Sequence, residues 1–167
     1  MQRILMIGSN GAGKSTFSFR LSETLKLPLV HIDQIYWRGC WDVTPEVEFD
    51  RIVRGEAAKD RWIIEGNNIR SLPDRLIRAD TVFWFEFPPL LCVWNILRRE
   101  LKYRGQVRPD MPDQCVSRCD LAFLKMVWAF NRKNRNRIQA LLSQYDHLSV
   151  IRFTNYCQVR RYWKQLL

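Results

Sequence analysis

The chain has 167 residues and a formal net charge of +10, with 27 basic and 17 acidic residues. Its hydrophobic fraction of 47% fits one folded domain and excludes a disordered or fibrous protein. The sequence has no run of about 18 apolar residues, so we expect no membrane span. Five cysteines without a C-x-x-C pair favour free thiols in a reducing cytoplasm. We therefore expect a single cytoplasmic domain over residues 1–167.

The first half of the chain alternates short apolar runs with amphipathic segments. The apolar runs predict strands at residues 2–7, 29–32 and 62–65. Helical patterns cover residues 14–25, 44–59 and 73–79. Thr44 followed by Pro45 predicts the N-cap and the first position of the second of these helices. We expect residues 34–43 to be irregular or partly helical.

The second half continues the alternation. Apolar runs predict strands at residues 81–87 and 148–153, and helical patterns cover residues 90–103, 117–142 and 155–166. We expect a break near Asn131 in the long helix and an N-cap at Asn155 in the last one. Residues 105–115 carry one glycine and two prolines and predict a loop. Strands alternating with helices predict an α/β domain whose parallel sheet is covered by helices on both faces.

A glycine-rich motif follows the first predicted strand. Gly8-Ser-Asn-Gly-Ala-Gly13-Lys14-Ser15 matches G-x-x-x-x-G-K-[ST], with a helix expected directly after it. In this P-loop, backbone N–H groups and the helix N-terminus surround phosphate oxygens. Lys14 is expected at the β- and γ-phosphates, Ser15 at magnesium and Thr16 near the α-phosphate. The predicted nucleotide-binding residues are Gly8, Ser9, Asn10, Gly11, Ala12, Gly13, Lys14, Ser15 and Thr16. The sequence lacks the Asn-Lys-x-Asp motif that recognises guanine in GTPases. This absence favours ATP, bound with Mg²⁺.

Acidic residues stand at the ends of three predicted strands. The carboxyl ends of parallel strands share one edge, where a magnesium ligand is expected. Glu65 is the preferred metal ligand because it ends a buried run and precedes a glycine. Asp33 is interpreted either as a catalytic base or acceptor ligand, or as a cap of the following turn. Glu86 is expected to be a surface acid, and His31 to pack within its strand.

Most of the net positive charge, +7 of +10, falls between Arg98 and Arg137, where the sequence has eleven basic and four acidic residues. Phosphoryl transfer spreads negative charge over phosphate oxygens, which arginines stabilise. A helix, a loop and a second helix that carry arginines are typical of a lid that closes over a nucleotide. We expect this lid at about residues 98–135, with arginines at positions 98, 99, 118, 132 and 135.

These features resemble the small P-loop kinases related to adenylate kinase and shikimate kinase, and among them the bacterial DNA topology modulation proteins. The resemblance covers nearly the whole chain. Besides the P-loop, it rests on His31-Ile-Asp33-x-x-Tyr36-Trp37, Trp41, Trp62-Ile-Ile-Glu-Gly-Asn67, Ala79-Asp80-Thr81-Val82, Leu97-Arg98-Arg99, Cys115, Arg118-Cys119-Asp120, Phe123-Leu124 and Trp128.

The resemblance implies a three-layer P-loop NTPase fold with a five-stranded parallel sheet in the order 2-3-1-4-5. It implies ATP as the phosphate donor, Glu65 as the magnesium-side acid and Asp33 as an acceptor contact. Arg98 falls at an adenine-side lid position, and Arg135 at a phosphate-contacting one. Two features depart from the pattern. Ser117 stands where a glutamate is expected, and Glu65-Gly-Asn-Asn-Ile69 replaces the Asp-Gly-Phe-Pro-Arg of adenylate kinase, so the nucleoside-monophosphate signature is missing.

The leading functional hypothesis is an ATP-dependent kinase that phosphorylates an unidentified small molecule or nucleotide. The expected acceptor side comprises Asp33, Tyr36, Trp37, Trp41 and Arg75. A second interpretation of Tyr36, Trp37 and Trp41 is that they pack beneath a helix on the acceptor side. Two other functions remain open: a nucleotide-binding regulatory protein that associates with DNA, and a slow ATPase without an acceptor. The net charge favours DNA binding, but the sequence has no recognised DNA-binding motif.

Overall fold

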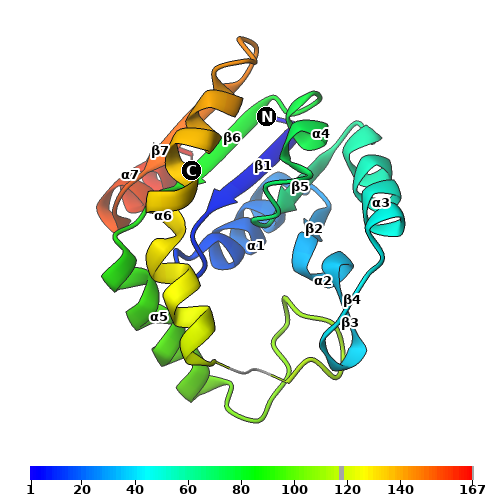
Figure 1. The fold of residues 1–167 in the computed structure, drawn as a ribbon. Coiled ribbons are helices and arrows are strands. Elements are labelled where there is room, and N and C mark those ends of the chain that lie inside the picture. Colours follow the sequence, from blue (N-terminus) through cyan, green and yellow to red (C-terminus); the bar gives the residue numbers. More distant parts are fainter. Residues whose placement is uncertain (117–118, 167) are drawn as a thin grey trace.

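The computed structural model describes residues 1–116 and 119–166. Its centre is a parallel sheet of five strands in the spatial order β2-β5-β1-β6-β7 (Figure 1). The strands are β1 (Arg3–Gly8), β2 (Leu29–His31), β5 (Trp62–Glu65), β6 (Thr81–Phe85) and β7 (Ser149–Phe153). Counted within this sheet alone, the order is 2-3-1-4-5, which confirms the prediction.

Helices cover both faces of the sheet, as predicted. They are α1 (Lys14–Leu25), α2 (Ile32–Tyr36), α3 (Glu46–Ala58), α4 (Leu72–Leu76), α5 (Pro89–Lys102), α6 (Leu121–Leu142) and α7 (Tyr156–Leu166). Core contacts place α3, α4 and the C-terminal half of α6 on one face. They place α1, α5 and α7 on the other face. Among the described residues, no helix is both long and apolar enough to cross a membrane.

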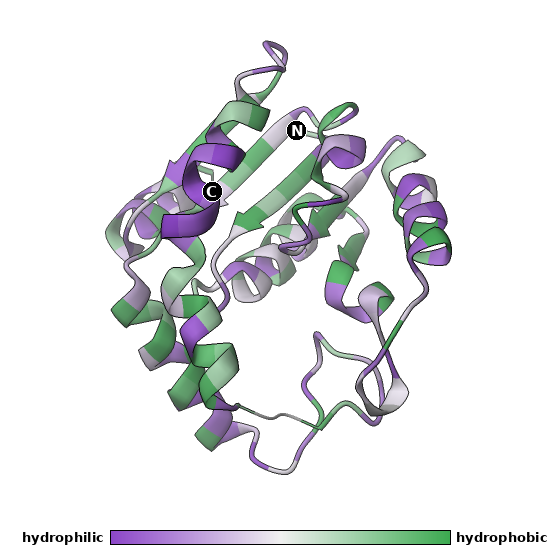
Figure 2. Ribbon diagram, in the orientation of Figure 1, coloured by the Kyte–Doolittle hydropathy of each residue, from purple (hydrophilic) through white to green (hydrophobic). Residues whose placement is uncertain are grey.

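The strand sequences explain why both faces are covered. Successive side chains of a strand point to opposite faces of a sheet. In β1, Leu5 and Ile7 enter the core on the α3 side, whereas Ile4 and Met6 enter the core on the α1 side. All four are at most 1% exposed, and the central strands are hydrophobic along their length (Figure 2). A sheet with two apolar faces requires a helical layer on each.

Residues 34–43 contain a short hairpin that the sequence did not predict. β3 (Trp37–Arg38) pairs with β4 (Asp42–Val43) across a 3₁₀ turn, η1 (Gly39–Trp41). Thr44 follows this hairpin, and the prediction that it caps α3 is wrong. Its hydroxyl donates to the Ile35 carbonyl at 2.6 Å, so it holds the hairpin against α2 instead. The N-cap of α3 is Pro45.

The long helix α6 also differs from the prediction at its start. It begins at Leu121, because the Asp120 carboxylate accepts a hydrogen bond from the Phe123 N–H at 2.7 Å and caps the helix. The predicted start at residue 117 lies outside the described residues. The predicted break is wrong: α6 is continuous, and Asn131 donates to the Phe87 carbonyl at 2.7 Å. The predicted cap of α7 is confirmed, since Asn155 accepts from the Gln158 N–H at 3.0 Å.

The parallel register brings three strand ends to one edge of the sheet. β1 ends at Gly8, β2 at His31 and β5 at Glu65. His31 pairs with Glu65, and Met6 pairs with Glu65 from the other side. His31 and Glu65, which are 34 positions apart in the sequence, therefore meet at the edge of the sheet where α1 begins.

Candidate active site

The first turn of α1 and the loop before it form a cradle for an anion. Gly13 caps α1 with a left-handed backbone (φ 88°) and offers no side chain to the N–H groups of the first turn. These donors therefore remain for a ligand. Gly11 also has a positive φ of 79°, and a Cβ atom there would lie 2.3 Å from the Cys92 carbonyl oxygen. The loop can pass this close to α5 only because residue 11 is glycine.

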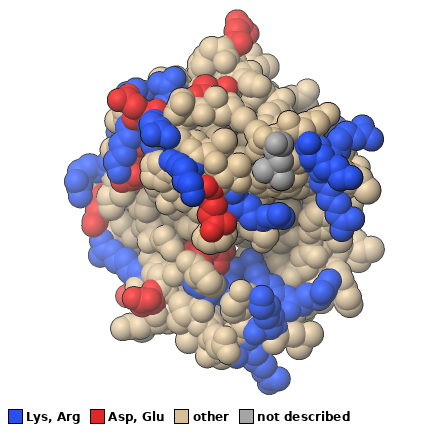
Figure 3. All heavy atoms as spheres, turned by 180° about the vertical axis from the view of Figure 1, so that it is seen from behind, with Lys and Arg blue, Asp and Glu red and all other residues tan. Residues whose placement is uncertain are grey.

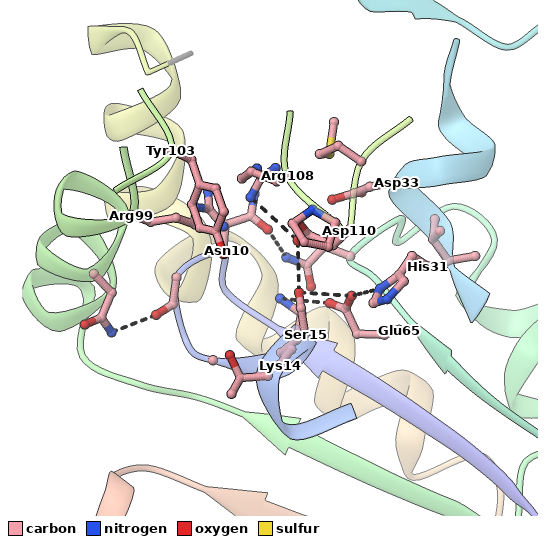
Figure 4. Close-up of a pocket in the computed structure, with 18 of the residues that line it drawn as sticks. Asn10, Lys14, Ser15, His31, Asp33, Glu65, Arg99, Tyr103, Arg108 and Asp110 are labelled. Atoms are coloured by element: carbon pink, nitrogen blue, oxygen red, sulfur yellow. Dashed lines mark hydrogen bonds and ion pairs between the residues drawn. The ribbon is translucent and has the colours of Figure 1, made fainter. Parts of the chain in front are cut away.

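A polar centre lies beside the cradle (Figure 4). Lys14 Nζ donates to the Ser9 carbonyl at 3.1 Å and lies 3.7 Å from Glu65 Oε1. The Ser15 hydroxyl lies 3.3 Å from Glu65 Oε2, and His31 Nδ1 lies 3.0 Å from the same oxygen. Ser15 and Glu65, the two predicted magnesium ligands, are thus adjacent. His31, for which packing within its strand was the preferred interpretation, is the hydrogen-bond partner of Glu65.

The electrostatics of this centre favour an ionised Glu65. Burial alone would raise the pKa of Glu65, but the His31 hydrogen bond and the Lys14 charge outweigh burial and lower it. Burial would lower the pKa of His31, but the hydrogen bond and charge of Glu65 raise it above its ordinary value of 6.5. An ionised carboxylate and a hydroxyl supply oxygen ligands, the kind that Mg²⁺ prefers. The residues present therefore fit a magnesium ion that arrives with a nucleotide.

Asp33 faces the same cavity from α2. Burial raises its pKa from 3.8 to about 6, and the negative charge of Glu65 adds to the increase. Its carboxylate accepts no hydrogen bond from the residues that the structure describes. The interpretation of Asp33 as a turn cap is wrong, because it lies inside α2, whose N-cap is His31. Its function as a base or an acceptor ligand stays a prediction.

A loop that follows α5 supplies two further charged residues, which the sequence analysis did not single out. We call residues 103–116 the lid loop. The Ser15 hydroxyl lies 3.2 Å from Asp110 Oδ2, and Arg108 Nη1 lies 3.6 Å from the same oxygen. Arg108 is only 9% exposed. Figure 4 shows both side chains directed toward Ser15 from the side opposite β1.

The lid loop is held to α2 and to the hairpin, on the side of the cavity where an acceptor is expected. The Gln34 side-chain amide donates to the Pro109 carbonyl at 3.1 Å. The Cys115 thiol donates to the Arg38 carbonyl at 3.2 Å, and Cys115 is completely buried. The loop therefore bridges the hairpin and the P-loop. The glycine and the two prolines of residues 105–115 predicted this loop, but no local pattern singled out Arg108 or Asp110.

The arginines predicted for the lid take different positions. Arg98 is exposed on α5 and does not line the cavity, whereas its neighbour Arg99 does. Arg135 Nε lies 3.0 Å from Glu86 Oε1, and its side chain is 51% exposed. Arg118 lies outside the described residues. The roles of Arg98 and Arg135 in catalysis stay predictions.

Glu86 was expected at the surface and Arg75 on the acceptor side, but each is bound to partners inside the protein. The prediction that Glu86 is a surface acid is wrong, since its side chain is only 8% exposed and pairs with Arg135 and Arg152. Arg75 is completely buried beneath the segment that follows β5, not on the acceptor side. Its guanidinium donates to the carbonyls of Ser71, Gly66 and Asn68 at 3.2, 3.2 and 2.5 Å.

Arg75 thereby fixes a segment that contacts the P-loop. Asn67 accepts a hydrogen bond from the Gly8 N–H at 3.1 Å and donates to the Asn10 side chain at 2.8 Å. Of the Asn-Asn pair that replaces the nucleoside-monophosphate signature, Asn67 thus contacts the P-loop, whereas Asn68 contacts Ser71 and Arg75. Sequence reasoning identified the departure but not this contact.

One cavity of about 1260 Å³ joins these groups. The P-loop and α5 line one side, and Asp33, Tyr36, Trp37 and Trp41 line the other. The Trp37 and Trp41 rings are edge-to-face at 5.3 Å, so the aromatic residues contact one another and also border the cavity. A pocket for one small ligand commonly has about 300–1,000 Å³. The cavity has room for a nucleotide and a second molecule.

No protein-family model matches the chain, and no curated protein matches it. The comparison with solved structures, in contrast, agrees with this architecture. Among solved structures, a shikimate kinase from Acinetobacter baumannii in complex with shikimate aligns with a TM-score of 0.60 and 17% identity, over 99% of this chain and 91% of the other. A shikimate kinase from Bacteroides thetaiotaomicron aligns with a TM-score of 0.57 and 18% identity, over 99% and 98%.

These matches do not bear on the resemblance to DNA topology modulation proteins, which stays a prediction. At such low identity they report on architecture alone. The chain has the P-loop fold of the shikimate kinases.

Proposed function

We propose that this protein is an ATP-dependent kinase that transfers the γ-phosphate to a hydroxyl group of a small molecule. The observation that carries this proposal is the single cavity in which the P-loop centre faces Asp33 and the lid loop. Lys14, Ser15 and Glu65 lie on one side, and Asp33 approaches from α2. A nucleotide-binding protein without an acceptor would not need the second side.

In this proposal the cradle binds the triphosphate and Lys14 contacts its β- and γ-phosphates. The magnesium ion would be held by Ser15 and Glu65, and it would neutralise the charge of the phosphates. Arg108 and Arg99 both line the cavity, and we assign to them the stabilisation of charge on the transferring group. The buried position of Arg108 strengthens this interaction, because water screens it poorly.

Asp33 is the proposed base. The acceptor oxygen forms a bond to the γ-phosphorus while the bond between that phosphorus and the β,γ-bridging oxygen breaks, and the hydroxyl proton passes to Asp33. A pKa of about 6 suits this step, since the carboxylate is ionised at neutral pH and is still basic enough to accept a proton.

The fold supports a small-molecule kinase, since one of the matched kinases is described with shikimate bound. The DNA-binding alternative has less support. On the face seen in Figure 3, Lys and Arg side chains form separate groups with acidic side chains among them, not a continuous stripe.

A screen for the acceptor tests the proposal. Nucleoside monophosphates, nucleosides and small hydroxy acids are each incubated with ATP and Mg²⁺, and ADP release above the acceptor-free rate is measured. Lys14→Ala is the control and should abolish the increase. If no compound raises ADP release, the kinase proposal is refuted. If Lys14→Ala binds ATP as tightly as wild type, the assignment of the P-loop is wrong.

A further inference from the structure

The lid loop places a second carboxylate on the hydroxyl of Ser15. Glu65 Oε2 lies 3.3 Å from Ser15 Oγ and Asp110 Oδ2 lies 3.2 Å from it. A serine hydroxyl has one proton and can donate to only one of them. One of the two carboxylate oxygens therefore lies close to Ser15 Oγ without accepting a hydrogen bond from it. This arrangement is favourable when a cation lies among the three oxygens.

The basic side chains around the two carboxylates are unevenly shared. Glu65 has two basic partners, since His31 Nδ1 is 3.0 Å from Glu65 Oε2 and Lys14 Nζ is 3.7 Å from Glu65 Oε1. Asp110 has a long ion pair with Arg108, whose Nη1 is 3.6 Å from Asp110 Oδ2. Because Arg108 borders the cavity where the phosphates are expected, a bound triphosphate would share its charge and weaken this ion pair, and the charge of Asp110 would be balanced less.

The position of Asp110 does not depend on the contact with Ser15 alone. The preceding residue, Pro109, accepts a hydrogen bond from Gln34, and Cys115 anchors the other end of the loop to Arg38. These contacts hold Asp110 over the start of α1. The Asp110 carboxylate thus comes from a third element, the lid loop, and lies where α1 supplies Ser15 and β5 supplies Glu65.

We propose that Asp110 is a further metal-side ligand, which binds the magnesium ion directly or through a metal-bound water when the nucleotide is present. The inference rests on the proposed function, because the metal arrives with the nucleotide. It adds that the metal joins the lid loop to the P-loop, so that closure of the loop depends on the metal. Oxygen ligands supplied partly by water and phosphate are usual for Mg²⁺.

Metal affinity in the nucleotide complex tests the inference without any measurement of activity. Mn²⁺ replaces Mg²⁺, the nucleotide is a non-hydrolysable ATP analogue at saturating concentration, and free Mn²⁺ is measured by electron paramagnetic resonance. Asp110→Asn is compared with wild type and with Asp113→Asn, which removes an exposed acid from the same loop. Nucleotide affinity in EDTA and the thermal melting temperature are measured for all three.

We expect Asp110→Asn to weaken Mn²⁺ binding by about tenfold, while metal-free nucleotide affinity and melting temperature stay at wild-type values. Asp113→Asn should match wild type throughout. Equal Mn²⁺ affinity in the two variants would overturn the inference and leave the proposed function standing. Loss of nucleotide binding by Asp110→Asn in EDTA would also overturn it, because the residue would then act without the metal. Failure of the wild-type protein to bind nucleotide would refute both the inference and the proposed function.

Proteolysis gives a second readout. Arg104 is exposed in the lid loop and is a site for trypsin. The analogue with Mg²⁺ should slow cleavage after Arg104 in wild type and in Asp113→Asn more than the analogue with EDTA does. In Asp110→Asn this extra protection by the metal should disappear. Full metal-dependent protection in Asp110→Asn would show that the metal does not close the loop through this residue.

Discussion

Asp33→Asn should stabilise the protein at neutral pH and inactivate it. The folded protein raises the pKa of Asp33 from 3.8 to about 6, mainly because burial disfavours the charged form. An increase of this size corresponds to at most about 3 kcal/mol, at about 1.4 kcal/mol per pKa unit. The side chain keeps some contact with water, so we expect a cost of about 1–2 kcal/mol.

The sign follows from which state holds the proton. Well below pH 3.8 Asp33 is protonated in both states and costs nothing. As the pH rises from 3.8 to 6, the unfolded chain loses this proton before the folded protein does, so stability falls. Well above pH 6 the cost is complete and constant. Asparagine carries no charge at any pH, so the variant avoids the cost.

The assay is urea denaturation of wild type and Asp33→Asn at about pH 4 and about pH 7.5, where the cost is respectively small and complete. The free-energy difference between the two proteins should be larger at the higher pH by about 1–2 kcal/mol. Asp146→Asn, an exposed acid in the turn before β7, controls for the loss of one charge and should show no such change. A difference that does not vary with pH would refute the claim that burial raises the pKa of Asp33.

The catalytic rate of Asp33→Asn should fall, although its stability rises. Loss of a general base commonly lowers kcat by about 10²–10⁴. We expect that reduction in Asp33→Asn, with ATP affinity unchanged, once an acceptor is known. A stabilised variant that keeps its kcat would show that Asp33 is buried but is not the base.

Three further substitutions test other parts of the site. Arg75→Met leaves three carbonyls without a donor and should lower the free energy of unfolding by about 2–4 kcal/mol; urea denaturation measures this, and the exposed ion pair of Arg78 should contribute under about 1 kcal/mol in Arg78→Met. Arg108→Met should lower kcat about 10³-fold, whereas the exposed Arg104→Met should not; equal rates in the two would exclude Arg108 from catalysis. Asn67→Ala removes two hydrogen bonds to the P-loop and should weaken ATP binding about tenfold in calorimetry.

The parts of the site that depend on local sequence were predictable. The P-loop motif fixes its own conformation, because glycines, a strand end and a helix start are neighbours in the chain. The order of the sheet followed from the resemblance, and the parallel register then brought Glu65 beside Ser15. The contact of Glu65 with Ser15 agrees with the position expected for Glu65 at the end of its strand, and its function as a metal ligand stays a prediction.

The parts that depend on long-range contacts were not predictable. Asp110 meets Ser15 across 95 positions, and the contacts that hold the lid loop come from residues about 75 positions earlier. Nothing in the local pattern around Asp110 distinguishes it from Asp113. Arg75 and Glu86 were misplaced for a related reason: charged side chains are usually exposed, and only the backbone carbonyls and arginines around these two explain their burial.

The buried thiol of Cys115 gives the protein an internal probe of loop opening. Its hydrogen bond to Arg38 exists only while the lid loop rests on the hairpin, and no part of the residue reaches solvent in that state. An alkylating reagent can therefore modify Cys115 only in molecules whose loop has lifted, whereas the exposed Cys157 reacts in every molecule. A change in the ratio of the two labelling rates therefore reports a change in loop opening, without a substrate.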